Sequence, residues 1–346
     1  MGWLGNSLTK LVTDIAGAPP LQLTFVPSVP APSVPGIGEA IEPDSCYIEL
    51  WLESLRLTRG RKFATRFHGI AYSFVELPRE GMESARLTAI SKPDKLADID
   101  PKAPDRVITV SKRMMGATAF RGNPLSLQFG LFSVKDGDLL TPVLNYLTSV
   151  SSTAGISYVG AIKPFLPLIE QGMDLLTGQT SDTALEVGVD TGLTLANGCA
   201  AAIIAQPKGS VNTAKLSVDT DGSLLLDGKL IDCGYAVFSL RPKTQNPEYG
   251  GIPELKERYA AFLSAIRGGK AAEAQDALTA FRLAVVASPD LIPSDARTLI
   301  EKAEGKFKDA FPPAGGTGFG LRAAKAGKRA ARPGPDETLS DIGLYK

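Results

Sequence analysis

The chain has 346 residues, of which 44% are hydrophobic and 21% are charged, and its 37 basic side chains balance its 37 acidic ones. A chain of this length is expected to form two or three structural units, and its composition excludes a wholly disordered protein and a dedicated nucleic-acid coat. Its three cysteines, Cys46, Cys199 and Cys233, are widely separated and odd in number. This pattern argues against a disulfide framework and predicts a cytoplasmic protein.

Residues 1–17 carry apolar side chains at helical spacing, which predicts an amphipathic helix over residues 3–16. The side chains of its apolar face are Trp3, Leu4, Leu8, Leu11, Val12 and Ile15. Such a helix can pack on the protein's own core, dock on a partner protein or lie peripherally on an anionic membrane. Because Lys10 is its only cation, the basic face of a membrane-surface helix is missing, and the sequence favours packing on the core.

Residues 18–44 are rich in proline and carry no charge before Glu39. Prolines at this density interrupt any regular hydrogen-bond ladder, so the sequence predicts an extended linker or arm. The alternative is a proline-rich ligand for an aromatic groove on a partner, because the PxxP spacing occurs at Pro27 and again at Pro32.

Between residues 45 and 242, apolar and polar residues alternate in short runs such as CYIELWLESLRL, which is typical of strands. A helical insertion is expected at about residues 139–177, with strands before and after it. Short strands without alternating strand and helix units favour an antiparallel β sandwich, C2-like or jelly-roll-like, over a doubly wound sheet. Residues 139–162 carry no charge, but Pro142, Asn145 and many Ser and Thr favour a packed helix over a membrane span.

From residue 252 to 311 the period changes to that of helices, which predicts a small bundle of three helices and an overall α+β class. The first helix is expected to start at Pro253 and to end at Gly268 and Gly269, and the third to be capped by Ser294 or Asp295.

Residues 312–346 predict a flexible basic tail. Its cations are Arg322, Lys325, Lys328, Arg329 and Arg332. They could contact an anionic partner or an anionic membrane surface. No aromatic residue lies among them, so base stacking and nucleic-acid recognition are not indicated.

Two constellations are candidates for chemistry. Asp219 and Asp221 precede Gly222 and are weak candidates for holding a cation, although a hairpin turn explains the same residues more simply. His68 is the single histidine, so a nucleophilic dyad requires it to meet one of the cysteines. Buried cysteines are mostly structural, and no nucleotide-binding or hydrolase motif is present, so no cofactor is predicted.

These features favour a non-enzymatic intracellular module that binds protein partners or assembles within a larger complex through its N-terminal helix and its tail. One alternative is a membrane-acting effector or toxin that is kept soluble until cleavage or assembly. The other, and the least favoured, is a hydrolase that depends on a Cys/His pair.

Overall fold

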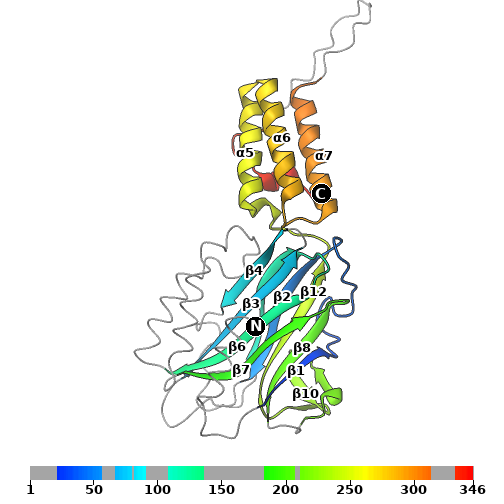
Figure 1. The fold of residues 1–346 in the computed structure, drawn as a ribbon, viewed down its shortest axis with the longest axis vertical. Coiled ribbons are helices and arrows are strands. Elements are labelled where there is room, and N and C mark those ends of the chain that lie inside the picture. The colour runs from blue at the N-terminus through cyan, green and yellow to red at the C-terminus, as the bar shows by residue number, and fades with distance from the viewer. Residues whose placement is uncertain are drawn as a thin grey trace, which may run out of the picture. The chain divides into compact units, whose positions relative to one another are not determined.

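The computed structural model describes residues 22–56, 67–79, 82–90, 108–135, 183–206, 211–312 and 332–345. The chain divides into two compact units, Met1–Thr244 and Gln245–Lys346 (Figure 1). The predicted N-terminal helix and the predicted helical insertion lie outside the described residues.

The first unit is built from antiparallel sheets, and with the helices of the second unit it gives a mixed α and β protein. The five-stranded sheet has the order β1 (Gln22–Val29), β8 (Cys199–Gln206), β12 (Gly234–Lys243), β2 (Tyr47–Arg56) and β5 (Ile108–Ala119). The four-stranded sheet has the order β4 (Met82–Ile90), β3 (Phe67–Arg79), β6 (Leu125–Lys135) and β7 (Thr183–Leu193). A three-stranded sheet has the order β11 (Lys229–Leu230), β10 (Leu224–Leu226) and β9 (Leu216–Val218).

The two larger sheets share one hydrophobic core. Alternation along β2 places Ile48, Leu50 and Leu52 in this core, and Leu127 and Phe129 of β6 enter it from the four-stranded sheet. Phe238 of β12 is stacked at its centre, with ring centroids 6.2 Å from Phe25 and 6.1 Å from Phe129. Figure 1 shows the four-stranded sheet lying over one face of the five-stranded sheet.

The opposite face of the five-stranded sheet is covered in part by the three-stranded sheet. Leu216, Val218 and Leu224 join Ile204 and Val237 in a second hydrophobic cluster. The β8 strand is therefore apolar on both faces, which explains its run of alanine and isoleucine.

Residues 18–44 are predicted as an extended arm or linker; residues 22–29 are extended as predicted, but residues 22–44 are packed on the first unit and are not a free linker. Residues 22–29 form β1, an edge strand that pairs with β8, and Pro30 O accepts a hydrogen bond of 2.8 Å from Val218 N. Ala31 and Ile41 are buried. Prolines are tolerated because β1 is at the edge of the sheet and its register is irregular between Val26 and Val29, where Pro27 stands.

The second unit contains three helices, α5 (Pro253–Gly268), α6 (Ala271–Ala287) and α7 (Pro293–Ala310). The predicted start of α5 at Pro253 and its predicted end are confirmed, and Gly269 ends this helix with a left-handed φ of 73°. The predicted side-chain cap of α7 is wrong: the helix starts at Pro293 without one, and Asp295 lies in its first turn. Proline favours the first helical position, which moves Ser294 and Asp295 inside the helix.

The predicted flexible tail is wrong for residues 332–345, which we call the docked segment. Leu339 and Leu344 are buried, and the segment includes a short 3-10 helix, η4 (Leu339–Ile342). Thr338 and Asp341 form a capping box at the start of η4. The segment therefore completes the core of the helical unit.

Tyrosines and lysines hold the docked segment. Tyr249, in the 3-10 helix η3 (Tyr249–Gly251), donates a hydrogen bond of 2.9 Å to Ser340 O, and Tyr345 Oη donates one of 2.5 Å to Asp295 Oδ2. Lys306 pairs with Glu337, and Lys302 Nζ donates to Gly343 O. The segment is thus tied to η3 and to α7 along its length.

Tyr259 of α5 is fully buried, and its hydroxyl has no hydrogen-bond partner among the described residues. Burial raises the pKa of this phenol, and the nearby charges of Glu337 and Asp341 raise it further. Both carboxylates belong to the docked segment, so the segment lies close to this unsatisfied hydroxyl.

Substitution of Phe238 by alanine tests the shared core. We expect Phe238→Ala to lower the free energy of unfolding of the first unit by about 3–5 kcal/mol, because the cavity left between Phe25 and Phe129 adds to the lost burial. Urea unfolding followed by tryptophan fluorescence measures the change. The control is Leu230→Ala, whose side chain is exposed. A loss for Phe238→Ala no larger than the control's would contradict the shared core.

Substitution of Tyr259 by phenylalanine tests the unsatisfied hydroxyl. We expect Tyr259→Phe to stabilise the helical unit by about 1 kcal/mol at neutral pH, because a buried hydroxyl without a partner is removed. The unfolded tyrosine ionises near pH 10 while the folded one stays protonated, so wild-type stability falls above about pH 10 and the advantage of the variant grows by about 1.4 kcal/mol per pH unit.

Thermal unfolding followed by helical circular dichroism at several pH values measures both effects. The control is Tyr249→Phe, which loses the hydrogen bond to Ser340 O and should be destabilised by about 1 kcal/mol. A pH-independent difference between Tyr259→Phe and wild type would show that Tyr259 ionises normally.

Candidate functional site

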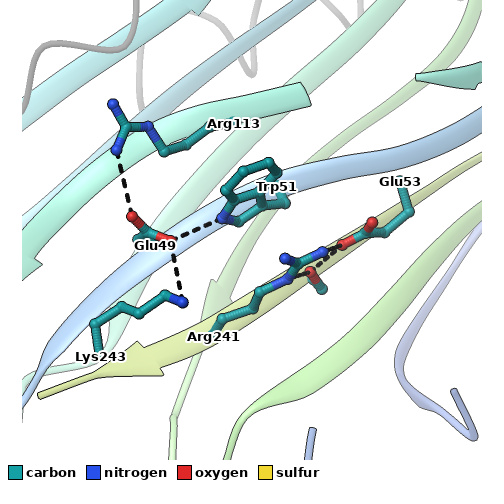
Figure 2. Close-up of polar contacts among 7 residues, drawn as sticks. Glu49, Trp51, Glu53, Arg113, Arg241 and Lys243 are labelled. Atoms are coloured by element: carbon teal, nitrogen blue, oxygen red, sulfur yellow. Dashed lines mark hydrogen bonds and ion pairs between the residues drawn. The ribbon is translucent and has the colours of Figure 1, made fainter. Parts of the chain in front are cut away.

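The outer face of the five-stranded sheet, away from the shared core, carries a cluster of charged side chains around a tryptophan (Figure 2). We call it the outer-face cluster; its members are Glu49, Trp51 and Glu53 of β2, Arg113 of β5, and Ser239, Arg241 and Lys243 of β12. The register places Ser239 opposite Trp51 and Arg241 opposite Glu49. Period-two alternation therefore brings these side chains to one face, while Leu50, Leu52 and Leu240 point into the core.

A β-bulge at Glu53 shapes one end of the cluster. Phe238 pairs with Leu52 and Val237 with Ser54, so Glu53 is the extra residue on β2. The bulge places two successive polar side chains on the outer face, since Glu53 contacts Arg241 and Ser54 Oγ donates to Gly222 O. It also returns Leu55 to the shared core.

Arg241 and Glu53 form a buried ion pair. Arg241 Nη2 lies 2.5 Å from Glu53 Oε1, and the two side chains are only 9% and 6% exposed. Arg241 Nε donates a 2.9 Å hydrogen bond to Ser239 Oγ, whose hydroxyl donates to Glu53. The guanidinium also stacks over Trp51, 4.6 Å from the ring centroid. These added contacts offset the desolvation that makes isolated buried pairs costly.

Glu49 is the second carboxylate of the cluster, and it lies next to the cations that are partly exposed to solvent. Trp51 Nε1 donates a 2.9 Å hydrogen bond to Glu49 Oε2, and Arg113 Nη1 lies 3.4 Å from Glu49 Oε1. Lys243 Nζ is 4.0 Å from Oε2, with a side chain that is 44% exposed. The cluster thus has a buried ion pair inside and partly exposed cations at its rim.

The charged residues of the outer-face cluster form a network of ion pairs. Both carboxylates are engaged with cations of the protein, so neither stands open to a substrate as a general acid or base. The exposed parts, Lys243 and Arg113, are suited to an electrostatic contact at a surface. The cluster therefore links β2, β5 and β12 and marks one polar surface of the first unit.

The weak metal candidates, Asp219 and Asp221, lie in the turn between β9 and β10. Asp219 N donates to Ser223 O at 2.9 Å, and Gly222 has a φ of 84°. Both carboxylates accept hydrogen bonds from backbone N–H groups of the same turn, from Thr220 N at 2.7 Å and from Ser223 N at 2.9 Å. No group of three His, Cys, Asp or Glu that could hold a metal occurs within the described ranges. These residues build a turn, as their Asp-Gly pattern predicts.

The cysteines lie on different sides of the five-stranded sheet. Cys46 and Cys199 pack with the shared core, whereas Cys233 belongs to the cluster on the opposite face. Burial raises the pKa of both the Cys46 and the Cys199 thiol, and Cys46 Sγ donates to Glu42 O at 3.4 Å. His68 lies on β3, in the other large sheet. Raised pKa values disfavour the thiolate that a nucleophile requires, which argues against Cys46 and Cys199 as that nucleophile.

Most of the predicted partner-contact residues lie outside the described part of the chain: Trp3, Leu4, Leu8, Leu11, Val12, Ile15, Arg322, Lys325, Lys328 and Arg329. Arg332 is described, is exposed and lies beside Gly269 at the start of the docked segment. Among the described helices, none has the length and apolar character needed to cross a membrane.

Sequence reasoning missed the outer-face cluster and the docked segment. The sequence alone shows that Glu49, Trp51 and Glu53 alternate along β2. The pairing of Glu53 with Arg241, however, depends on which strands are neighbours in the sheet. For the docked segment, the apolar residues Leu339 and Leu344 after the basic stretch indicated that this part of the chain is buried.

Comparisons with family models, with curated proteins and with solved structures found no match to this chain.

Removal of Arg241 tests the outer-face cluster. We expect Arg241→Ala to lower the free energy of unfolding by about 3–5 kcal/mol, because it leaves the Glu53 carboxylate buried without its partner. The matched control on the same strand is Lys243→Ala, which should cost less than about 1 kcal/mol because that lysine is half exposed.

Urea unfolding of both variants and of the double variant Arg241→Ala with Glu53→Gln gives the measurement. The double variant should recover part of the loss, because the buried charge is then removed with its partner. Equal losses for Arg241→Ala and Lys243→Ala would mean that the pair is not buried in solution.

Proposed function

We propose that this protein is a non-enzymatic binding or assembly module that acts within a larger protein complex. The observation that carries the proposal is a pair of exposed apolar side chains on α6, Leu283 and Val286, which are 66% and 73% exposed. Large apolar side chains favour burial, and we assign this pair on one helical turn to a contact with a partner.

The geometry of α6 supports this role. The helix packs against both α5 and α7 and buries Leu278, Phe281 and Val285 on that side. Leu283 and Val286 are three residues apart, so they lie on the same face one turn from each other. An apolar pair at this spacing fits the groove of a partner that recognises one helix face. Burial of both side chains would stabilise a complex by about 1.5–3 kcal/mol each before the costs of association.

The first unit is the scaffold in this proposal. Two antiparallel sheets that share one core support a sandwich of the C2-like or jelly-roll-like kind. Its outer-face cluster offers cations to a partner protein, and its cysteines are free, which agrees with a cytoplasmic location. The N-terminal helix of residues 3–16 remains a second contact element of the proposal, for a protein partner or for the periphery of an anionic membrane.

Replacement of the exposed pair tests the function. We expect the tagged wild-type chain, expressed in its source cells, to elute in a particle larger than the monomer, and the Leu283→Lys, Val286→Lys variant to elute as the monomer. Lysine near the end of a helix keeps α6 stable because it complements the helix dipole. Size-exclusion chromatography of cleared extracts makes the measurement.

The matched control is Ala260→Lys with Ser264→Lys, which adds the same charge at exposed positions of α5. Circular dichroism of the purified variants verifies that both keep the helical unit folded. Monomeric elution of the wild-type chain, or an unchanged particle for the α6 variant, would refute the proposed function.

A further inference from the structure

The docked segment interacts with the helices in the manner of a bound peptide. Its anchors are the buried leucines Leu339 and Leu344 and the aromatic side chain of Tyr345, whose ring meets Tyr249 edge to face at a centroid distance of 5.7 Å. The surface that receives it is formed by η3, α5 and α7, and we call it the docking surface.

Charge and shape at the docking surface fit this segment. The segment contains three carboxylates, Asp336, Glu337 and Asp341, and the single cation Arg332. The docking surface presents Lys302 and Lys306, which bind Gly343 O and Glu337. A Cβ on Gly250 would overlap Ser340 Oγ and lie 3.0 Å from Ser340 N, so only glycine permits this close approach.

The connection between α7 and the docked segment is long. Residues 313–331 separate Pro312 from Arg332, and 19 residues can span roughly 60 Å when extended. This exceeds twice the length of α7, which is about 27 Å. A segment on such a connection can reach the docking surface of a neighbouring copy, where it would meet the same partners that it meets in its own chain.

The docked state also leaves one polar group of the helical unit unsatisfied. With the segment docked, the Tyr259 hydroxyl is buried without a partner among the described residues, and the carboxylates of Glu337 and Asp341 lie near it. An unsatisfied buried hydroxyl weakens the docked state relative to what its apolar contacts alone would give.

We propose that residues 332–345 are an exchangeable docking element, and that the segment of one copy binds the η3, α5 and α7 surface of a second copy. Exchange of identical elements between copies is a low-cost route to association. Docking within one chain dominates at low concentration, and docking between chains grows as the protein concentration approaches the effective concentration of the joined segment, which is on the order of 1 mM. The proposal is independent of the α6 pair.

Isotope mixing with zero-length cross-linking tests the exchange. Heavy and light full-length proteins are mixed in equal amounts at concentrations from about 1 μM to about 1 mM, and a carbodiimide joins Lys306 to Glu337. Mass spectrometry then distinguishes cross-linked peptide pairs of one isotope from mixed pairs. We expect the mixed share of all Lys306–Glu337 cross-links to rise with concentration toward one half, the value reached when every segment is docked on another chain.

Two variants control the test. Gly250→Ala should abolish the Lys306–Glu337 cross-link, because its Cβ displaces Ser340, whereas Gly268→Ala, where a Cβ meets nothing within 4 Å, should leave it unchanged. Cross-links of one isotope only, at every concentration, would overturn the exchange. Absence of the cross-link in the wild-type protein would overturn the docking itself.

Discussion

The requirement that both faces of the five-stranded sheet be covered governs the architecture of the first unit. Its inner face meets the four-stranded sheet through Phe238 and its two aromatic neighbours, and part of its outer face is covered by the three-stranded sheet. Because β8 and β12 are buried on both sides, they tolerate only small or apolar residues over much of their length. The proline-containing strand β1 is confined to the edge for the same reason.

The outer face toward β5 is covered differently. Instead of apolar side chains it carries Arg241, Glu53 and Trp51, which satisfy one another. The bulge at Glu53 allows β2 to place polar side chains in this cluster and apolar side chains in the shared core. A buried ion pair of this kind contributes little net stability, but it penalises any register that separates its members.

The core of the helical unit depends on the docked segment. Three helices of this length leave an incompletely covered core, and the docked segment supplies Leu339 and Leu344 to complete it. This packing leaves the Tyr259 hydroxyl buried without a hydrogen-bond partner among the described residues. On α6, Leu283 and Val286 stay exposed. The docked segment occupies one surface of the helical unit, and the apolar pair on α6 is the surface that we propose for a protein partner.

The sequence by itself determined the elements whose signal is local. The 3.6-residue period located α5, α6 and α7, the period of two located β2, and the Asp-Gly pattern located the turn at Gly222, because these depend on neighbours along the chain. Only the tertiary structure decided that residues 22–29 are an edge strand, that Glu53 is bulged and that residues 332–345 dock on the helices. Each of these depends on a partner far away in sequence, which neither periodicity nor spacing identifies.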